Sequence, residues 1–93
     1  NVIYCEASGN YTVVHTANDK KMMISKNLKR VEDMIEVKEF YRVHRSFLVN
    51  LNHIKSYTKD GNLILSNDVE ILISSRNRKK IVDLLRGYGI SER

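Results

Sequence analysis

Short runs of β-branched and aromatic residues recur along most of this 93-residue chain, and a turn-forming cluster closes each run. Such runs favour strands over helices, because branched and ring-bearing side chains pack well on a pleated surface. Asp60-Gly61, between two of the runs, is a strong hairpin signal. The regular spacing predicts a sandwich dominated by β structure. The expected strands lie at residues 2–5, 11–16, 21–24, 40–43, 53–58, 62–66 and 69–73.

One segment between the third and fourth predicted strands has the period of a helix instead. Apolar Leu28, Val31 and Ile35 fall on one face, and charged residues occupy the other. Ser25 precedes them and is a plausible N-cap, since its hydroxyl can accept a hydrogen bond from an amide of the first turn. The pattern predicts a short amphipathic helix of about ten residues that packs its apolar stripe on a sheet.

The end of the chain predicts a second helix. Ile81 and Leu85 recur at helical spacing after a pair of serines, so we expect a helix over residues 76–86 with a serine cap. A glycine commonly follows the last turn of a helix, which leaves Gly87 or Gly89 as the stop. Basic residues fill the first turn, where cations oppose the positive end of the helix dipole. A bound phosphate would offset that cost.

The formal net charge of +5 is concentrated in two segments. Residues 25–58 hold seven Lys or Arg against four acids, and residues 74–93 hold six against two. Residues 1–24 are balanced, and residues 59–73 are acidic. Localised basicity favours a polyanionic partner such as nucleic acid, although many soluble domains carry such a patch without binding nucleic acid.

No arrangement in the sequence points to catalysis, a cofactor or a metal ion. The three histidines form no zinc-binding helix motif, and a site made from Cys5, His44 and His53 is conceivable but not expected. No glycine-rich phosphate loop or nucleophile elbow is present. A lone cysteine excludes an internal disulfide and fits a reducing cytoplasm, and no apolar run reaches the ~18–20 residues of a membrane span. We therefore expect a cytoplasmic binding domain and no enzyme.

The most distinctive motif lies at residues 40–50 and reads Phe-Tyr-Arg-Val-His-Arg-Ser-Phe-Leu-Val-Asn. Arg45 falls in the turn after a predicted strand, where its side chain can project outward and pair with a phosphate or a guanine edge. It could instead be a surface arginine that pairs with Glu36 or Glu39. The neighbouring histidine is more often an orienting residue, and the asparagine that closes the motif usually bonds its local backbone. Neither of these two is a predicted contact.

Four segments of the chain, in this order, resemble the LytTR DNA-binding domain, the output module of many bacterial response regulators. The strongest is Phe-x-Arg-x-His-Arg-Ser-Phe-Leu-Val-Asn-x-x-x-Ile at residues 40–54. Residues 3–11, Ile-Tyr-Cys-Glu-Ala-Ser-Gly-Asn-Tyr, are similar to the family's first strand and loop, and residues 23–34 to a strand and short helix. Residues 74–80, Ser-Ser-Arg-Asn-Arg-Lys-Lys, resemble its C-terminal segment, although a pair of serines replaces the commoner proline-containing approach.

The resemblance implies a mainly β fold, an elongated sandwich of small antiparallel sheets with one short internal helix and a C-terminal helix. Residues 1–93 are then one LytTR-type DNA-binding domain. The family begins with a further strand that this sequence lacks. Its members usually carry an N-terminal receiver domain, and nothing in this chain resembles one.

The resemblance also implies sequence-specific binding of double-stranded DNA by loops that enter successive major grooves, as in a transcriptional response regulator. Paired direct repeats are the expected site, with self-association on DNA. Arg76 would read bases, whereas serine hydroxyls and Lys79 would hold phosphates. The predicted contacts form three patches and are Asn10, Tyr11, Arg45, Ser74, Ser75, Arg76, Asn77, Arg78 and Lys79.

Two other classes of function stay open from the residues alone. A protein-interaction or sensing module could keep this fold without binding DNA. A single-stranded RNA-binding domain would need several exposed aromatic residues on one surface, and the tyrosines here are dispersed. DNA binding requires Arg45, Arg76 and Lys79 to lie on one face, whereas the other classes have no such requirement.

Overall fold

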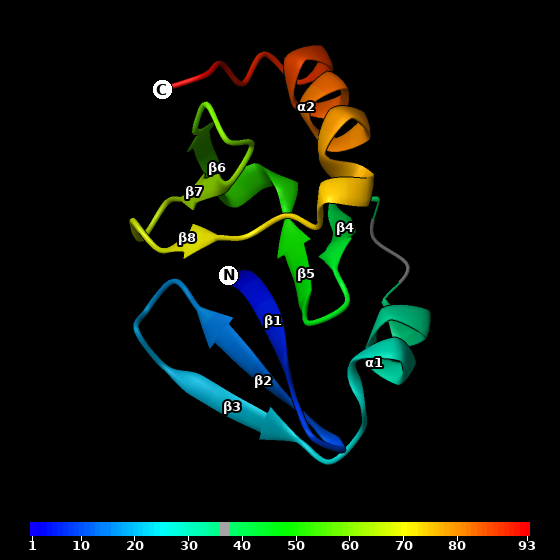
Figure 1. Cartoon of the computed structure of the whole chain (residues 1–93). Helices are drawn as coiled ribbons and strands as arrows, with labels where there is room; N and C mark the ends of the chain where they lie inside the picture. The colour runs from blue at the N-terminus through cyan, green and yellow to red at the C-terminus, as the bar shows by residue number, and fades with distance from the viewer. Residues whose placement is uncertain (36–37) are drawn as a thin grey trace.

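Two antiparallel sheets and two α-helices make up the fold in residues 1–35 and 38–93, which this computed structural model describes (Figure 1). The strands and α-helices are β1 (Val2–Ser8), β2 (Tyr11–Thr16), β3 (Lys21–Ile24), α1 (Leu28–Met34), β4 (Phe40–His44), β5 (Phe47–Asn50), β6 (Ile54–Tyr57), β7 (Leu63–Leu65), β8 (Glu70–Ile71) and α2 (Arg78–Gly87), and two 3₁₀ turns are η1 (Leu51–His53) and η2 (Ser75–Asn77). The larger sheet has the order β3-β2-β1-β5-β4, and the smaller has the order β6-β7-β8. The predicted mainly β sandwich with an internal and a C-terminal helix is confirmed.

β1 is the central strand of the larger sheet, where segments far apart in the sequence meet. It pairs with β2 through a hairpin and with β5 through partners such as Cys5 and Leu48. Asn50 ties the end of β5 to β1, because its side-chain amide donates to the Val2 carbonyl at 2.9 Å. The Asn50 Oδ1 also accepts from the Asn52 amide at 3.0 Å, so this asparagine stabilises the backbone.

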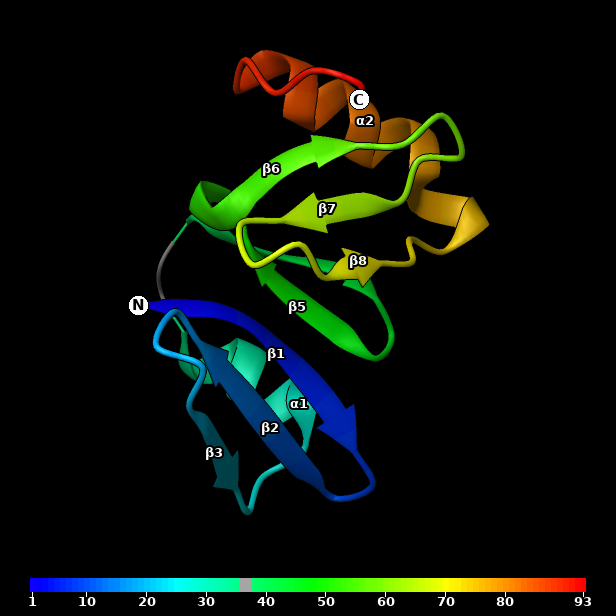
Figure 2. The same cartoon turned by 90° about the vertical axis from the view of Figure 1, so that its left-hand side faces the viewer.

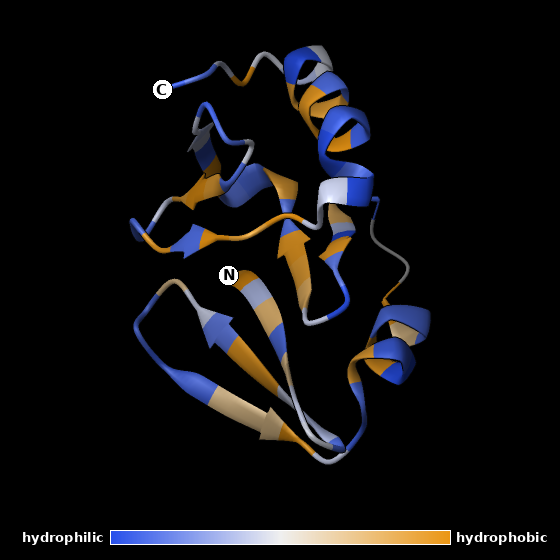
Figure 3. Cartoon of the chain, viewed as in Figure 1, coloured by the Kyte–Doolittle hydropathy of each residue, from blue (hydrophilic) through white to orange (hydrophobic). Residues whose placement is uncertain are grey.

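The two faces of the larger sheet pack against different elements. Cys5, on one face, is buried with Leu28 and Val31 of α1. Tyr4 points to the opposite face, because successive side chains of a strand alternate, and it belongs to the core that includes the smaller sheet and α2. Figure 3 shows the apolar side of α2 turned toward the smaller sheet and its polar side turned outward. The larger sheet is thus covered by α1 on one face and by the smaller sheet with α2 on the other.

α1 begins later and is shorter than the sequence pattern predicts. Asn27 is the N-cap in place of Ser25, because the Asn27 Oδ1 accepts a hydrogen bond from the Arg30 amide at 2.9 Å. The helix spans seven residues and stops before Ile35, whose backbone is extended. The Ile35 side chain still packs on the same apolar cluster, which explains why the apolar spacing overestimates the helix.

The C-terminal helix is confirmed, but its predicted serine cap is wrong. The chain enters through the 3₁₀ turn η2, which the backbone itself closes with a hydrogen bond from the Asn77 amide to the Ser74 carbonyl at 3.0 Å. Neither Ser74, before this turn, nor Asn77, before α2, makes a capping bond with its side chain. The serine hydroxyls are therefore not used by the helix.

Gly89 is the glycine that ends α2. It has φ 78°, a left-handed conformation that glycine adopts without steric cost. The Ile90 amide donates to the Leu85 carbonyl at 2.9 Å and the Gly89 amide to the Arg86 carbonyl at 3.0 Å, which together form a Schellman-type ending. Gly87, the other candidate, is the last residue of the helix itself.

The molecule is elongated, with principal extents of 35 × 28 × 22 Å. Along the long dimension, the β1–β2 turn, the β4–β5 turn and the start of α2 follow one another on the same side of the molecule (Figure 2). No helix in the described part of the chain is long and apolar enough to cross a membrane. The three loops that this side presents are the three patches predicted to contact DNA.

Candidate nucleic-acid interface

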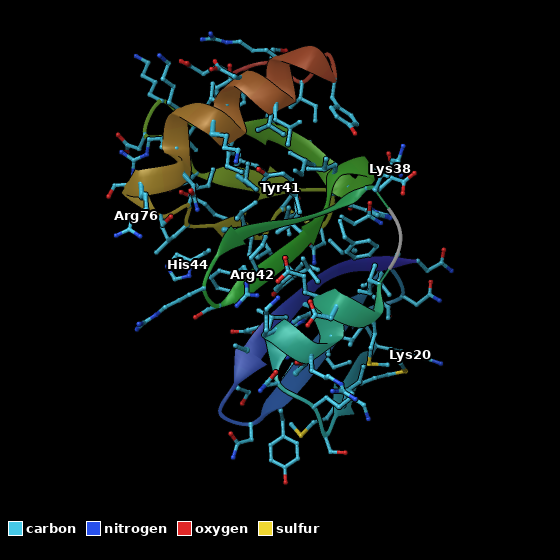
Figure 4. The ribbon with its side chains drawn as sticks, turned by 90° about the vertical axis from the view of Figure 1, so that its right-hand side faces the viewer. Lys20, Lys38, Tyr41, Arg42, His44 and Arg76 are labelled. Atoms are coloured by element: carbon cyan, nitrogen blue, oxygen red, sulfur yellow. The ribbon has the colours of Figure 1, made fainter. Side chains whose placement is uncertain are left out.

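An open groove of about 390 Å³ lies between the β4–β5 turn and the segment that leads into α2. Two arginines line it, one from each wall, and its lining contains no acidic side chain. Figure 4 shows that His44 and Arg76 reach the same edge of the molecule. The groove brings together five of the predicted contacts with one residue that was not predicted. Its lining consists of His44, Arg45, Ser74, Ser75, Arg76 and Asn77.

His44 shapes the β4–β5 turn from within. The Ser46 amide donates to Nδ1 of His44 at 3.1 Å, so the neutral ring carries its proton on Nε2. Phe47 packs beside this ring with a centroid separation of 5.5 Å. The pairing of β4 with β5 shifts register between Arg42 and His44, an irregularity that redirects the strand end. His44 is therefore an orienting residue, and it also lines the groove.

The Arg45 side chain is exposed at the tip of this turn. Among the described residues it makes no ion pair, so the alternative pairing with Glu39 is not present. Glu36, the other alternative partner, lies outside the described residues. The two peptide groups that flank Arg45 are both held in place, because Arg42 donates to the carbonyl oxygens of His44 at 3.0 Å and of Arg45 at 2.6 Å.

The opposite wall of the groove presents polar groups without partners in the described part of the chain. Arg76 and Ser75 are exposed in η2, and Ser74 is half-buried. Arg76 makes no ion pair with any described residue. A guanidinium that follows two serine hydroxyls, at the entry to a ten-residue helix, is suited to bind an anionic backbone.

Arg78 and Lys79 lie outside the groove lining. The Arg78 stem runs over the β6–β7 hairpin, since a Cβ atom added at Gly61 would lie 2.6 Å from the Arg78 Cγ. Lys79 is exposed and lies on the side of α2 away from buried Ile81. Lys80, which was not predicted, lines a neighbouring depression of about 320 Å³.

Asn10 and Tyr11 lie at the far end of the molecule from this groove, at the β1–β2 turn. Gly9 and Asn10 form a two-residue loop between paired Ser8 and Tyr11, and Gly9 has φ 59°. Glycine at the first central position with positive φ is typical of a type II′ hairpin turn. Tyr11 is 48% exposed, so about half of the residue is open to solvent. In the described structure neither the Asn10 nor the Tyr11 side chain makes a hydrogen bond.

Two residues near the groove escaped prediction from sequence. The sequence predicts His44 to be an orienting residue and not a contact, and it predicts only that Arg42 lies in the strand at residues 40–43. The sequence did contain a hint of the role of Arg42. An arginine that lies two or three residues before an exposed turn can reach forward to the carbonyl oxygens of that turn. The pairing of its Nη1 with Glu32 Oε1, at 2.7 Å, joins α1 to β4 and could not be read from the sequence.

A second hollow, lined by apolar residues, lies on the α1 side of the larger sheet and has a volume of about 280 Å³. Cys5 is one of the residues that line it, and burial raises the pKa of the Cys5 thiol to about 11. The thiol is therefore protonated and unreactive near neutral pH. Within residues 1–35 and 38–93, no three His, Cys, Asp or Glu side chains cluster as metal ligands.

These features define a class of protein: a mainly β domain that presents arginines and hydroxyls from loops on one side, as polyanion-binding domains do. The profile of the LytTr DNA-binding domain matches residues 1–86. The chain therefore belongs to the LytTR DNA-binding domain family, which is a family of DNA-binding domains and not of enzymes.

Solved and curated relatives agree with this assignment. The LytTr DNA-binding domain of a protein described as a methyl-accepting/DNA response regulator from Bacillus cereus superposes with a TM-score of 0.73. It is 30% identical, and the match covers 92% of this chain and 81% of that one. The sensory transduction protein LytT of Oceanobacillus iheyensis is 31% identical over 90 residues, which are 90% of this chain and 37% of the relative. The CO-responsive transcriptional regulator RcoM of Rhodospirillum rubrum is 40% identical over 58 residues, which are 62% of this chain and 24% of the relative. The matches thus span only 24% and 37% of the length of these two curated relatives.

Proposed function

We propose that this domain binds double-stranded DNA in a sequence-specific manner, with the groove between the β4–β5 turn and η2 as its reading site. The observation that carries the proposal is the meeting of Arg45 and Arg76 in a groove without a carboxylate. An arginine can donate two parallel hydrogen bonds to the edge of a guanine in the major groove. Hydroxyl and amide groups beside it bind phosphates and set the register. We assign base reading to Arg45 and Arg76, and phosphate binding to Ser74, Ser75 and Asn77.

The remaining contacts extend this surface along the long axis of the domain. Asn10 and Tyr11, at the β1–β2 turn, lie on the same side as the groove but toward the other end (Figure 2). The domain is 35 Å long, and a turn of DNA is about 34 Å long. These dimensions support contacts with successive major grooves on one side of the duplex.

Lys79 and Arg78 contribute phosphate contacts at the edge of the groove in this proposal. Lys79 is exposed on the outer side of α2 and is placed to attract a backbone that follows the helix start. The aliphatic part of the Arg78 side chain packs against Gly61, so its guanidinium would contact the duplex only at the edge of the proposed interface. We therefore expect a smaller effect from Arg78 than from Lys79.

For the whole protein, we propose a cytoplasmic bacterial transcription regulator of the response-regulator kind. The names of the relatives, a CO-responsive transcriptional regulator and a sensory transduction protein, support a regulator in which another domain receives the signal. A receiver domain on the N-terminal side is the form we propose. Two copies of the domain would occupy paired direct repeats and associate on the DNA.

Selection from a pool of random-sequence duplexes tests the proposal. The domain is incubated with the pool at two salt concentrations, binding is followed by fluorescence anisotropy, and the bound fraction is sequenced. We expect a repeated motif to be enriched, with an affinity that falls steeply as salt rises. Weak binding without enrichment would contradict sequence reading and favour a protein-interaction module that kept the fold.

A pair of variants then separates reading from phosphate binding. Arg76→Ala should cost about 1–3 kcal/mol on the selected duplex and relax its sequence preference. Lys79→Ala should weaken binding to the selected duplex and to a scrambled duplex alike. It should also reduce the slope of log affinity against log salt concentration by about one, the value of one phosphate contact. Equal losses on both duplexes for both variants would remove the base-reading role of Arg76.

A further inference from the structure

Arg42 uses all three donor nitrogens of its guanidinium in the described structure, and each bond has a different partner. Nε donates to the His44 carbonyl at 3.0 Å, and Nη2 donates to the Arg45 carbonyl at 2.6 Å. Nη1 donates to Glu32 Oε1 at 2.7 Å. One planar group therefore joins α1 to two consecutive carbonyls of the β4–β5 turn.

We propose that Arg42 is a positioning residue for DNA reading, which clasps the β4–β5 turn and fixes the direction in which the Arg45 side chain leaves it. This inference rests on the proposed function of the groove. Glu32 completes the clasp by holding the guanidinium from the α1 side. Figure 4 shows Arg42 near the turn that carries His44, between β4 and α1.

The geometry of the two carbonyl bonds carries the argument. The His44 carbonyl belongs to the peptide group before the Arg45 Cα atom, and the Arg45 carbonyl belongs to the peptide group after it. Rotation about φ and ψ of a residue is rotation of these two peptide groups. Because one rigid, planar guanidinium binds both, the backbone conformation of Arg45 is held, and so is the origin of its side chain.

Arg42 is itself poorly placed to read DNA. Its side chain is 26% exposed, and the side chain of its partner Glu32 is 34% exposed. A phosphate that approached Arg42 would have to compete with the Glu32 carboxylate and with two carbonyl oxygens. Arg42 is also not part of the groove lining. It acts on DNA through Arg45 and not by contact.

The clasp also supports a second hydrogen bond within the turn. The amide of Ser46 donates to His44 Nδ1 at 3.1 Å, a bond that requires the turn to keep its shape. If the Arg42 bonds are lost, we expect this amide to be exposed to solvent more often. The exchange rate of the Ser46 amide is therefore a reporter of the clasp in the absence of DNA.

Arg42→Lys is the variant that tests the inference, because it keeps the positive charge and removes the planar guanidinium with its several donors. A lysine ammonium on a flexible stem can pair with Glu32 but cannot hold two carbonyls in one plane. We expect affinity for the selected duplex to fall about tenfold, the equivalent of one or two hydrogen bonds. Affinity for a scrambled duplex and the salt dependence should stay the same, and the Ser46 amide should exchange about tenfold faster in the free domain.

Two further variants control the experiment. Arg30→Lys makes the same chemical change at an exposed position of α1 where no side-chain hydrogen bond is present among the described residues, and it should alter none of the readouts. Glu32→Gln keeps a hydrogen-bond acceptor but removes the charge, and it should produce a weaker form of the Arg42→Lys effect. Thermal unfolding of each variant identifies the temperature range in which all are folded, and binding is compared there.

The possible outcomes separate the clasp from the proposed function. Equal losses on both duplexes with reduced salt dependence would mean that Arg42 binds phosphate directly, which overturns the inference. Unchanged affinity and unchanged amide exchange would overturn it as well. If the wild-type domain selects no sequence, the proposed function fails, and the amide exchange of Arg42→Lys alone decides whether Arg42 holds the turn.

Discussion

The β4–β5 turn and the β1–β2 turn both belong to the proposed DNA-binding surface, but they are held in place in different ways. The β4–β5 turn is gripped by side chains, with Arg42 on its carbonyls and His44 on its amide. The β1–β2 turn is held by strand pairing up to Ser8 and Tyr11 and by the positive φ of Gly9. The first arrangement fixes a side chain in advance, whereas the second leaves the loop residues free to adapt.

This difference suggests that the two turns have different roles in the proposed DNA-binding surface. A group that is held in place before binding loses less conformational entropy on binding and discriminates more sharply. We therefore expect base discrimination to reside mainly at the groove, around Arg45 and Arg76. The β1–β2 turn, with an exposed Tyr11, would add affinity that tolerates more than one sequence.

The largest expected effect is a loss of folding stability when the packing of α2 is disturbed, because the segment that leads into α2 forms one wall of the groove. Leu85 is fully buried in the main core, so Leu85→Ala should lower the free energy of unfolding by about 2–5 kcal/mol through lost burial and a cavity. Urea unfolding followed by circular dichroism measures the loss. Leu72→Ala makes the same change at a side chain that is 59% exposed and should be nearly neutral. Similar losses for both variants would mean that α2 does not anchor the groove.

Two glycines allow the two ends of the molecule to be compared by the same substitution. Gly9→Ala should cost about 1–2 kcal/mol in stability, because φ 59° is unfavourable for a residue with a Cβ, although no atom obstructs that Cβ. Gly61→Ala should cost at least as much, because its φ is 86° and its Cβ would also collide with the Arg78 side chain. Chemical denaturation of the two variants under one set of conditions gives the difference. A greater loss for Gly9→Ala would show that Arg78 leaves its position on Gly61 at little cost.

Sequence predicts this fold well wherever a local pattern decides the structure. The runs of β-branched and aromatic residues at 2–5 and 11–16 and the Asp60-Gly61 signal predict strands and a hairpin where the structure has them. The predicted start of α1 and the predicted cap of α2 were wrong, because several residues that can cap a helix lie close together before each of these helices. Whether Ser25 or Asn27 reaches a first-turn amide depends on how the chain leaves β3.

The site was predicted in its parts but not in its assembly. The resemblance placed Arg45 and Arg76 in separate patches, whereas the structure brings them together in one groove, because β4, β5 and α2 share one core. The position of Arg78 on Gly61 and the pairing of Arg42 with Glu32 depend on contacts between distant segments. Local periodicity holds no information about such contacts.

A smaller effect should follow from a change at the β1–β2 turn. Tyr11→Phe removes the phenol and keeps the exposed ring, so it should lower affinity for the selected duplex by about 0.5–1.5 kcal/mol, the value of one hydrogen bond. Arg76→Ala should cost more and should also relax the sequence preference. Anisotropy titrations of both variants on the selected and scrambled duplexes provide the comparison. If Tyr11→Phe alters the preferred sequence more than Arg76→Ala does, the proposed difference in roles is wrong.

The last effect is absent at neutral pH, because it concerns a buried thiol on the strand that carries the β1–β2 turn and appears only at alkaline pH. Burial raises the pKa of the Cys5 thiol from its ordinary value of 9.0 to about 11. The folded state therefore holds this proton more tightly than the unfolded state, so stability is unaffected below about pH 9 and falls as pH rises toward 11. Unfolding of the wild type and of Cys5→Ala over this range isolates the thiol, because the buried Tyr4, whose pKa is also raised by burial and by Glu6, is present in both. A parallel decline in the two proteins would mean that solvent reaches the Cys5 thiol in the folded state. β1 would then be open under α1, and adaptability at the hairpin would extend into its supporting strand.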